Sequence, residues 1–218
     1  MAVGELEQGW IDTEVAAEFP DLELVQLRVD AASGPTLPEI RERLRYLSRR
    51  MSGAEAVAFR TRPIPQAYRV LFRHLGLDPD ETRPPGEAVV VDRLIKGEYR
   101  ADNRLDDAIT IAVAETGVPV WALDEARLDG PLGLRPAHTG ETLGSAQFAN
   151  ELPSGRLVIA DAERTVGVLF GPLATSHLVT AETTAMRLFS VRAPGVPAIH
   201  VEEALWTVVE CLTAADRG

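Results

Sequence analysis

The chain has 218 residues, of which 45% are hydrophobic and 25% are charged, a composition typical of a folded globular protein. No apolar run approaches the roughly 18 to 20 residues that a membrane helix needs, so we expect no membrane association. The single cysteine, Cys211, excludes an internal disulfide and favours a reducing compartment. Because the acidic N-terminus also lacks a signal-peptide pattern, we expect a cytoplasmic protein with a single domain over residues 1–218.

Charge is unevenly distributed along the chain. The net charge of the whole chain is −11, which argues against non-specific binding to nucleic acid. Between Arg41 and Arg104, however, 14 arginine and lysine residues accompany 9 aspartate and glutamate residues, a local net charge of +5. Lys96 is the only lysine, so this positive charge is almost entirely guanidinium, which favours bidentate contacts with phosphate or carboxylate. The asymmetry indicates either a polyanionic partner or a solvated basic face of a helical region.

The first half of the chain is predicted to be mainly helical after one strand. Residues 22–30 alternate apolar and polar side chains and predict that strand. Thr36 and Glu39 form a capping-box pattern with a proline just inside the start of a helix, so we expect a helix from this point. Further helices are expected from Pro65 to Gly76, over residues 87–96, and from the N-cap Asn103 to Gly117.

The second half is predicted to be rich in strands. Strands are expected over residues 119–123 and 186–192, and a β-hairpin over 156–161 and 165–170. Residues 137–155 are predicted to form a loop, and the chain is predicted to end in an amphipathic helix. The expected fold class is therefore α+β, with a helical N-terminal half packed on a β-rich half and a closing C-terminal helix.

The common motifs of enzyme chemistry are not found. There is no phosphate-binding loop, no dinucleotide fingerprint and no zinc-protease motif, and the histidines are too scattered to predict a metal cluster, so we expect neither metal nor cofactor. The hydroxyl-rich segment 174–183 contains the catalytic candidates Ser176, His177, Thr180 and Glu182, because a histidine or glutamate there can act as a base on a water or an ester. The alternative is a turn whose Ser and Thr side chains bond to the nearby backbone. His74 falls on the apolar side of a predicted helix, so we expect it at the core or its boundary.

Seven short motifs keep a common order along the chain. They are NRLDDA at 103–108, ETGVPVWALD at 115–124, LDG at 128–130, GETL at 140–143, LVIAD at 157–161, GVLFG at 167–171 and VTAET at 179–183. Over residues 38–190 their order and spacing resemble the tRNA-binding editing domain, modules 3 and 4, of the phenylalanyl-tRNA synthetase β-subunit. In that synthetase the domain hydrolyses tyrosine wrongly attached to the phenylalanine tRNA. The resemblance therefore implies a free-standing editing-like domain that binds tRNA or aminoacyl-tRNA and hydrolyses a mischarged aminoacyl-tRNA in trans.

The resemblance also implies a substrate pocket. Its predicted residues are Asn103, Asp106, Trp121 and Gly171, of which Gly171 matches a pocket glycine of the family. Trp121 and Phe189, however, stand where the family has a histidine and a glutamate, so a module that binds tRNA or an amino acid without catalysis stays the alternative. Trp121 can stack on an aromatic side chain or a base, or it can be a core residue. Asn103 and Asp106 are explained equally well as a helix cap and a favourable charge at a helix start.

Arginines on two predicted helices are the candidates for binding RNA. Arg41, Arg45 and Arg49 recur every four residues and therefore line one edge of the first helix. Arg69 and Arg73 are predicted to face outward on the next helix. We expect these five side chains to contact tRNA phosphates.

Overall fold

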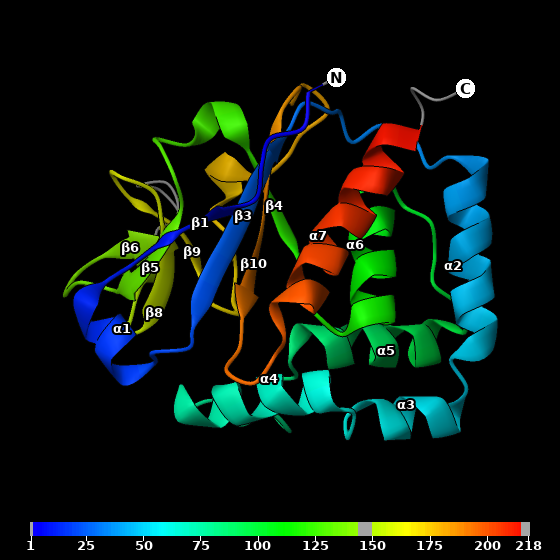
Figure 1. Ribbon diagram of the computed structural model, residues 1–218, viewed down its shortest axis with the longest axis horizontal. Coiled ribbons are helices and arrows are strands. Elements are labelled where there is room, and N and C mark those ends of the chain that lie inside the picture. The colour runs from blue at the N-terminus through cyan, green and yellow to red at the C-terminus, as the bar shows by residue number, and fades with distance from the viewer. Residues whose placement is uncertain (1, 144–149, 215–218) are drawn as a thin grey trace.

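The computed structural model describes residues 2–143 and 150–214. Figure 1 shows β-sheets on one side of the molecule and most of the helices on the other, with β3 and β10 next to the helix α7. The strands come from both ends of the chain. The α+β fold class is therefore confirmed, but the helical and β-rich parts do not follow one another as two halves of the sequence.

The central sheet has four antiparallel strands in the order β1-β3-β10-β4. Its strands are β1 (Glu7–Gln8), β3 (Glu23–Val29), β10 (Met186–Arg192) and β4 (Trp121–Asp124). β3 and β10 pair along their full length, from Met186 opposite Val29 to Arg192 opposite Glu23. The strands predicted from alternating and apolar patterns near 22–30, 119–123 and 186–192 are thus confirmed.

A second sheet has the order β2-β5-β8-β9. Its strands are β2 (Trp10–Ile11), β5 (Gly133–Pro136), β8 (Leu157–Ala160) and β9 (Thr165–Val168). β8 and β9 form the predicted hairpin. The loop predicted for 137–155 instead contains two short paired strands, β6 (Thr142–Leu143) and β7 (Asn150–Glu151), and its residues 144–149 lie outside the described residues.

Five of the described helices lie close to predicted ones, whereas α1 (Thr13–Glu18) and α3 (Gly53–Phe59) were not predicted. The five are α2 (Pro38–Arg50), α4 (Pro63–His74), α5 (Pro85–Lys96), α6 (Arg104–Thr116) and α7 (Ala198–Thr213). Two single turns of 3₁₀-helix, η1 (Glu125–Arg127) and η2 (Thr175–His177), follow β4 and β9. None of the described helices is both long and apolar enough to span a membrane.

One local prediction is wrong in detail. The residue that caps α2 is Leu37, which makes no side-chain cap hydrogen bond. The hydroxyl of Thr36 instead donates to the carboxylate of Asp107, on the neighbouring helix α6. The capping-box pattern is therefore replaced by a contact between helices.

The main hydrophobic core lies between α6, α7 and the central sheet. α7 packs along α6 and against β10, and its buried side chains include Leu205 and Val208. Leu27 and Leu188 contribute from β3 and β10. Cys211 on α7 is buried in this core, and burial raises the pKa of its thiol to about 11, as expected for a structural cysteine rather than a nucleophile.

Candidate functional site

Arg41, Arg45 and Arg49 lie on the outer surface of α2, the outermost helix at one end of the molecule (Figure 1). All three side chains are exposed, and none forms an ion pair with the residues that the structure describes. Arg43, on the inner side of the same helix, donates instead to both carboxylate oxygens of Glu115, at 2.9 and 2.6 Å. α2 therefore presents a row of unneutralised guanidinium groups, spaced about 6 Å apart along the helix axis.

Arg69 and Arg73 do not extend this row. The outward position predicted for Arg69 is wrong, because only 4% of its side chain is exposed. It donates to Glu87 on α5 at 3.0 and 3.1 Å and to Asp80 at 2.6 Å, so the later chain covers this face of α4. Arg73 is exposed, but it lies near the end of α4 that is remote from α2 in Figure 1. The neighbouring His74 is also exposed, contrary to its predicted place at the core boundary.

Ser176 and His177 form a hydrogen-bonded pair in η2. Ser176 Oγ lies 3.0 Å from His177 Nδ1. His177 is 4% exposed, whereas Ser176 is exposed. Burial, with a smaller contribution from the positive charge of Arg164, lowers the pKa of His177 below its ordinary value. The imidazole is therefore neutral near pH 7, the form in which a ring nitrogen can accept a proton.

The other two candidates of this segment belong to a turn. The backbone N–H of Thr180 donates to Thr183 Oγ1 at 3.0 Å, and the Thr183 hydroxyl donates to Asp124 Oδ2 at 2.9 Å. Thr180 Oγ1 accepts from the N–H of Glu182 at 3.3 Å. The expectation that hydroxyl groups here bond to the nearby backbone is confirmed for Thr180 and Thr183. Thr183 also fastens the loop to the end of β4.

Trp121 and Phe189 lie directly opposite each other on β4 and β10. Their rings are nearly parallel, with centroids 5.5 Å apart and an interplanar angle of 18°. Phe170, in a left-handed backbone conformation with φ 56°, lies 5.9 Å from Trp121 and 4.7 Å from Phe72 between ring centroids. Gly171 follows in a tight corner, where a Cβ would lie 2.9 Å from that of Val168. Trp121 thus stacks on Phe189 within the protein, and aromatic rings fill the space around it.

Asn103 and Asp106 lie at the start of α6 and act together as its cap. Asn103 Oδ1 accepts from the backbone N–H of Asp106 at 3.0 Å, and its amide donates to the Asp106 carboxylate at 2.5 Å. The capping role predicted for Asn103 is confirmed. α6 has 13 residues and is thus about 20 Å long. Trp121 follows its other end, so these four predicted substrate contacts do not form one pocket.

Sequence reasoning missed a polar hollow of about 690 Å³ beside the second sheet. Arg135 donates to both oxygens of Glu141 at 2.8 and 2.6 Å, and this pairing is the main reason that the pKa of Glu141 falls to about 2. Asp161 accepts three backbone N–H groups at 2.8 to 3.1 Å. The GETL and LVIAD motifs contain Glu141 and Asp161. These two acidic residues were the sequence signal from which the hollow could have been predicted. Both carboxylates are occupied by the protein's own donors.

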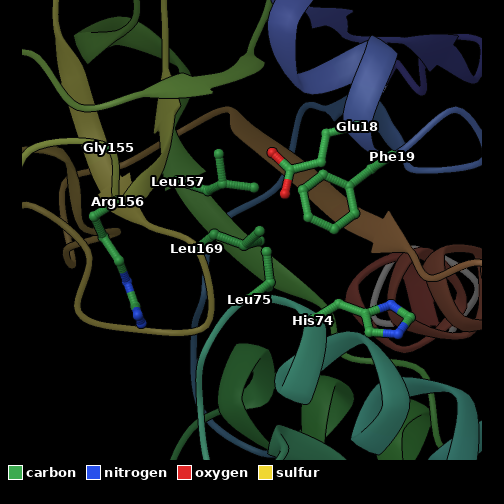
Figure 2. Close-up of a pocket in the computed structure, with 8 residues that line it drawn as sticks. All are labelled: Glu18, Phe19, His74, Leu75, Gly155, Arg156, Leu157 and Leu169. Carbon is green, nitrogen blue, oxygen red and sulfur yellow. The ribbon is translucent and has the colours of Figure 1, made fainter.

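A smaller cavity of about 150 Å³ lies between the end of α4 and the second sheet (Figure 2). Figure 2 shows the Glu18 carboxylate near Leu157, while the His74 ring and the Arg156 side chain point in different directions away from it. The charged groups therefore do not converge on one point. The volume is below the roughly 300 Å³ of most small-molecule sites. Over the described part of the chain, no group of three His, Cys, Asp or Glu side chains is placed to hold a metal ion.

No protein-family model matches the chain. A curated relative is the β-subunit of phenylalanine–tRNA ligase from Cutibacterium acnes, which is 33% identical over 107 residues. The matched region is 48% of this chain and 12% of the relative, so the chain spans only a small part of that protein. The match supports a loose relation between this chain and the β-subunit of phenylalanine–tRNA ligase.

Proposed function

We propose that this chain binds tRNA through the outer face of α2, as a free-standing domain similar to the editing region of the ligase β-subunit. The observation that carries the proposal is the row formed by Arg41, Arg45 and Arg49, which are exposed and have no carboxylate partner among the described residues. The relation to a tRNA ligase subunit supports the same partner. Guanidinium groups bind phosphate in a bidentate manner, and three of them on one helix edge can track a phosphate backbone.

The overall charge of −11 limits where tRNA can bind. Like charges elsewhere on the surface repel a polyanion, so binding must be confined to a local positive face and must weaken steeply with salt. Glu42 is exposed near this row, and its negative charge opposes binding. We therefore predict opposite effects on tRNA affinity. Neutralising the charge of Glu42 strengthens binding, whereas reversing the charges of Arg45 and Arg49 weakens it.

The test is tRNA affinity measured against salt concentration. We expect the double variant Arg45→Glu/Arg49→Glu to bind at least tenfold more weakly at low salt, and its log–log salt slope to fall by about 2, one for each lost phosphate contact. Glu42→Gln should bind slightly more tightly. Arg83→Glu is the matched control, since Arg83 is exposed in the loop before α5 and is not among the predicted RNA-binding arginines. Equal affinities for the wild type and the double variant would refute the role of α2.

A second candidate function is hydrolysis of an aminoacyl-tRNA ester in trans, and the Ser176–His177 pair favours it. A neutral imidazole can take a proton from a water oriented by the Ser176 hydroxyl. The resulting hydroxide attacks the ester carbonyl carbon, and the ester C–O bond then breaks. The imidazolium returns its proton to the leaving ribose oxygen, so the amino acid and the tRNA hydroxyl are released and the histidine is again neutral. The ester is already activated, so one positioned base is sufficient chemistry.

Hydrolysis is tested with a panel of correctly and wrongly charged tRNAs. We expect release of one amino acid by the wild type and loss of that release in Ser176→Ala/His177→Ala. Thr175→Ala, next to the pair, is the matched control. Binding of tRNA without release from any member of the panel would establish the alternative, a non-catalytic tRNA-binding module.

A further inference from the structure

A cavity of about 500 Å³ lies where α2, α3, α6 and α7 meet. Its lining contains no residue of the arginine row and none of η2. Its volume is within the range of small-molecule sites. The walls combine apolar side chains, two tyrosines and groups of both charges. The lining residues used below are Tyr46, Arg50, Glu55, Arg62, Tyr99, Glu115 and Glu203.

The Tyr99 hydroxyl has no hydrogen-bond partner among the described residues. The residue is 7% exposed, and its Oη is itself buried. Its backbone is held firmly, because its N–H donates to the buried Ser48 Oγ at 2.8 Å. Burial raises the pKa of the phenol to about 12, so the group is a neutral O–H at physiological pH. Tyr99 is one of the residues that line the cavity, so its hydroxyl is a buried donor beside the cavity that still lacks an acceptor among the described residues.

Tyr46 joins this cavity to the arginine row. It is 54% exposed, and the Arg50 guanidinium lies 5.5 Å from its ring centroid while donating to its hydroxyl at 2.8 Å. Tyr46 precedes Arg49 by three residues on α2, so the two side chains are neighbours on the helix surface. A nucleic-acid backbone bound along the row would therefore pass the exposed ring of Tyr46.

The charges around the cavity do not suit a phosphate. Arg50 and Arg62 stand among three glutamates, Glu55, Glu115 and Glu203. Arg62 is already paired with Glu55 at 2.6 Å. A planar group with both donors and acceptors at its edge fits these walls better. The Tyr99 hydroxyl can donate to a ring nitrogen or carbonyl of such a group, and Tyr46 offers a stacking face. The glutamates are paired with Arg43, Arg62 and His200, but each carboxylate keeps lone pairs that can accept from amino groups.

We propose that this cavity takes the base of one unpaired nucleotide of the tRNA whose phosphates bind to the arginine row. The inference rests on the proposed function. It uses the recognition mode typical of single-stranded RNA, in which a splayed-out base stacks on an aromatic ring and is read by hydrogen bonds at its edge.

The test compares pocket and row variants in the same tRNA-binding assay. Tyr99→Phe removes only the hydroxyl and should weaken binding about three- to tenfold, and Tyr46→Ala should weaken it about tenfold through loss of stacking. Both should leave the salt slope unchanged, whereas Arg45→Glu/Arg49→Glu lowers it. Trp206→Ala, which removes an exposed aromatic residue of α7 outside the cavity lining, is the control and should bind as the wild type does.

A second measurement separates the two proposals. Saturation-transfer NMR with the four nucleoside monophosphates should show contact between the wild type and the base protons of at least one of them, and Tyr46→Ala should reduce it. If tRNA binds but neither tyrosine variant weakens it, the base pocket is refuted and the tRNA-binding function stands. If tRNA does not bind, the proposed function fails, and absence of base contacts in the NMR experiment refutes the pocket as well. Binding of free amino acids in place of nucleotides would also overturn it.

Discussion

Arginines of the β-sheets and arginines of α2 meet different surroundings. Arg187 on β10 donates to both carboxylate oxygens of Glu125 at 2.6 and 2.8 Å, and Arg192 on the same strand pairs in the same bidentate way with Glu23. These guanidinium groups are half-buried and their partners come from distant parts of the chain. On the outer face of α2, Arg41, Arg45 and Arg49 have no such partner within the described residues.

These two environments show which positive charges of this acidic protein are available to a partner. A guanidinium with a bidentate carboxylate is electrically neutralised and positioned, so it contributes to the fold and attracts little from outside. A guanidinium without a carboxylate partner keeps its positive electrostatic field and its free N–H donors. A count of basic residues between Arg41 and Arg104 therefore overestimates the charge that a polyanion can meet, since Arg43, Arg60, Arg62 and Arg69 are all paired.

The largest effect is expected where a paired arginine is most buried. Glu87→Ala removes the carboxylate that faces Arg69 inside the α4–α5 contact, and leaves a charge that has little access to water. We expect the free energy of unfolding to fall by about 3 kcal/mol, because the desolvation cost of Arg69 is no longer offset. Urea denaturation followed by circular dichroism measures this.

Glu81→Ala is the control for that experiment, because Glu81 is an exposed carboxylate in the loop just before α5. Its effect should remain within about 0.5 kcal/mol. A loss below about 1 kcal/mol for Glu87→Ala would mean that Asp80 alone compensates Arg69, and the contrast between paired and unpaired arginines would then be weaker than the geometry indicates.

A smaller, pH-dependent effect is expected at Arg135 and Glu141. The pKa of Glu141 is about 2 in the folded chain against an ordinary value of 4.5. Its stabilisation is therefore fully present above about pH 4.5 and is lost as the pH falls toward 2. Glu141→Gln should cost about 1 to 3 kcal/mol at pH 7, and the difference from the wild type should shrink through this acid range.

Stability curves between pH 2 and 7 check this prediction, with Glu163→Gln as the control. Glu163 lines the same hollow but is exposed, so its substitution should change stability little at any pH. A constant difference between Glu141→Gln and the wild type over the whole range would contradict the assigned pKa shift.

Sequence reasoning predicted the elements that carry their own signals. Asn103 caps α6 and Gly117 ends it with φ 76°, both readable from a few neighbouring residues. β1 and β2 were missed because each has two residues, too few to show a period. β2 pairs with β5, where Gly133 lies opposite Trp10 more than a hundred residues along the chain, and such pairing leaves no local pattern.

The residues of the candidate site also divide into those that local sequence signals predict and those that they do not. The row Arg41, Arg45 and Arg49 follows from helical periodicity alone, and the structure places it on an exposed edge as expected. The position of Arg69 could not be predicted, because what covers it comes from residues 80 and 87. The cavity beside Tyr99 is assembled from four helices, and no single segment contains a signal for it.

The smallest predicted effect is a change in the free energy of unfolding when Arg45 is replaced. Its sign distinguishes an unpaired arginine from a paired one. Arg45 has a like charge four residues away on either side, and each such pair destabilises a helix by about 0.2 to 0.5 kcal/mol. Arg45→Ala should therefore raise the free energy of unfolding by up to about 1 kcal/mol at low salt, and the gain should diminish as salt screens the repulsion. Urea denaturation at two salt concentrations measures it, with Arg187→Ala expected to destabilise at both. If Arg45→Ala were destabilising, the row would be held by contacts of its own and could not be the free charge that the tRNA proposal requires. A stabilising result would mean that the folded chain retains Arg45 at a cost, which is what a residue kept for binding rather than for folding should do.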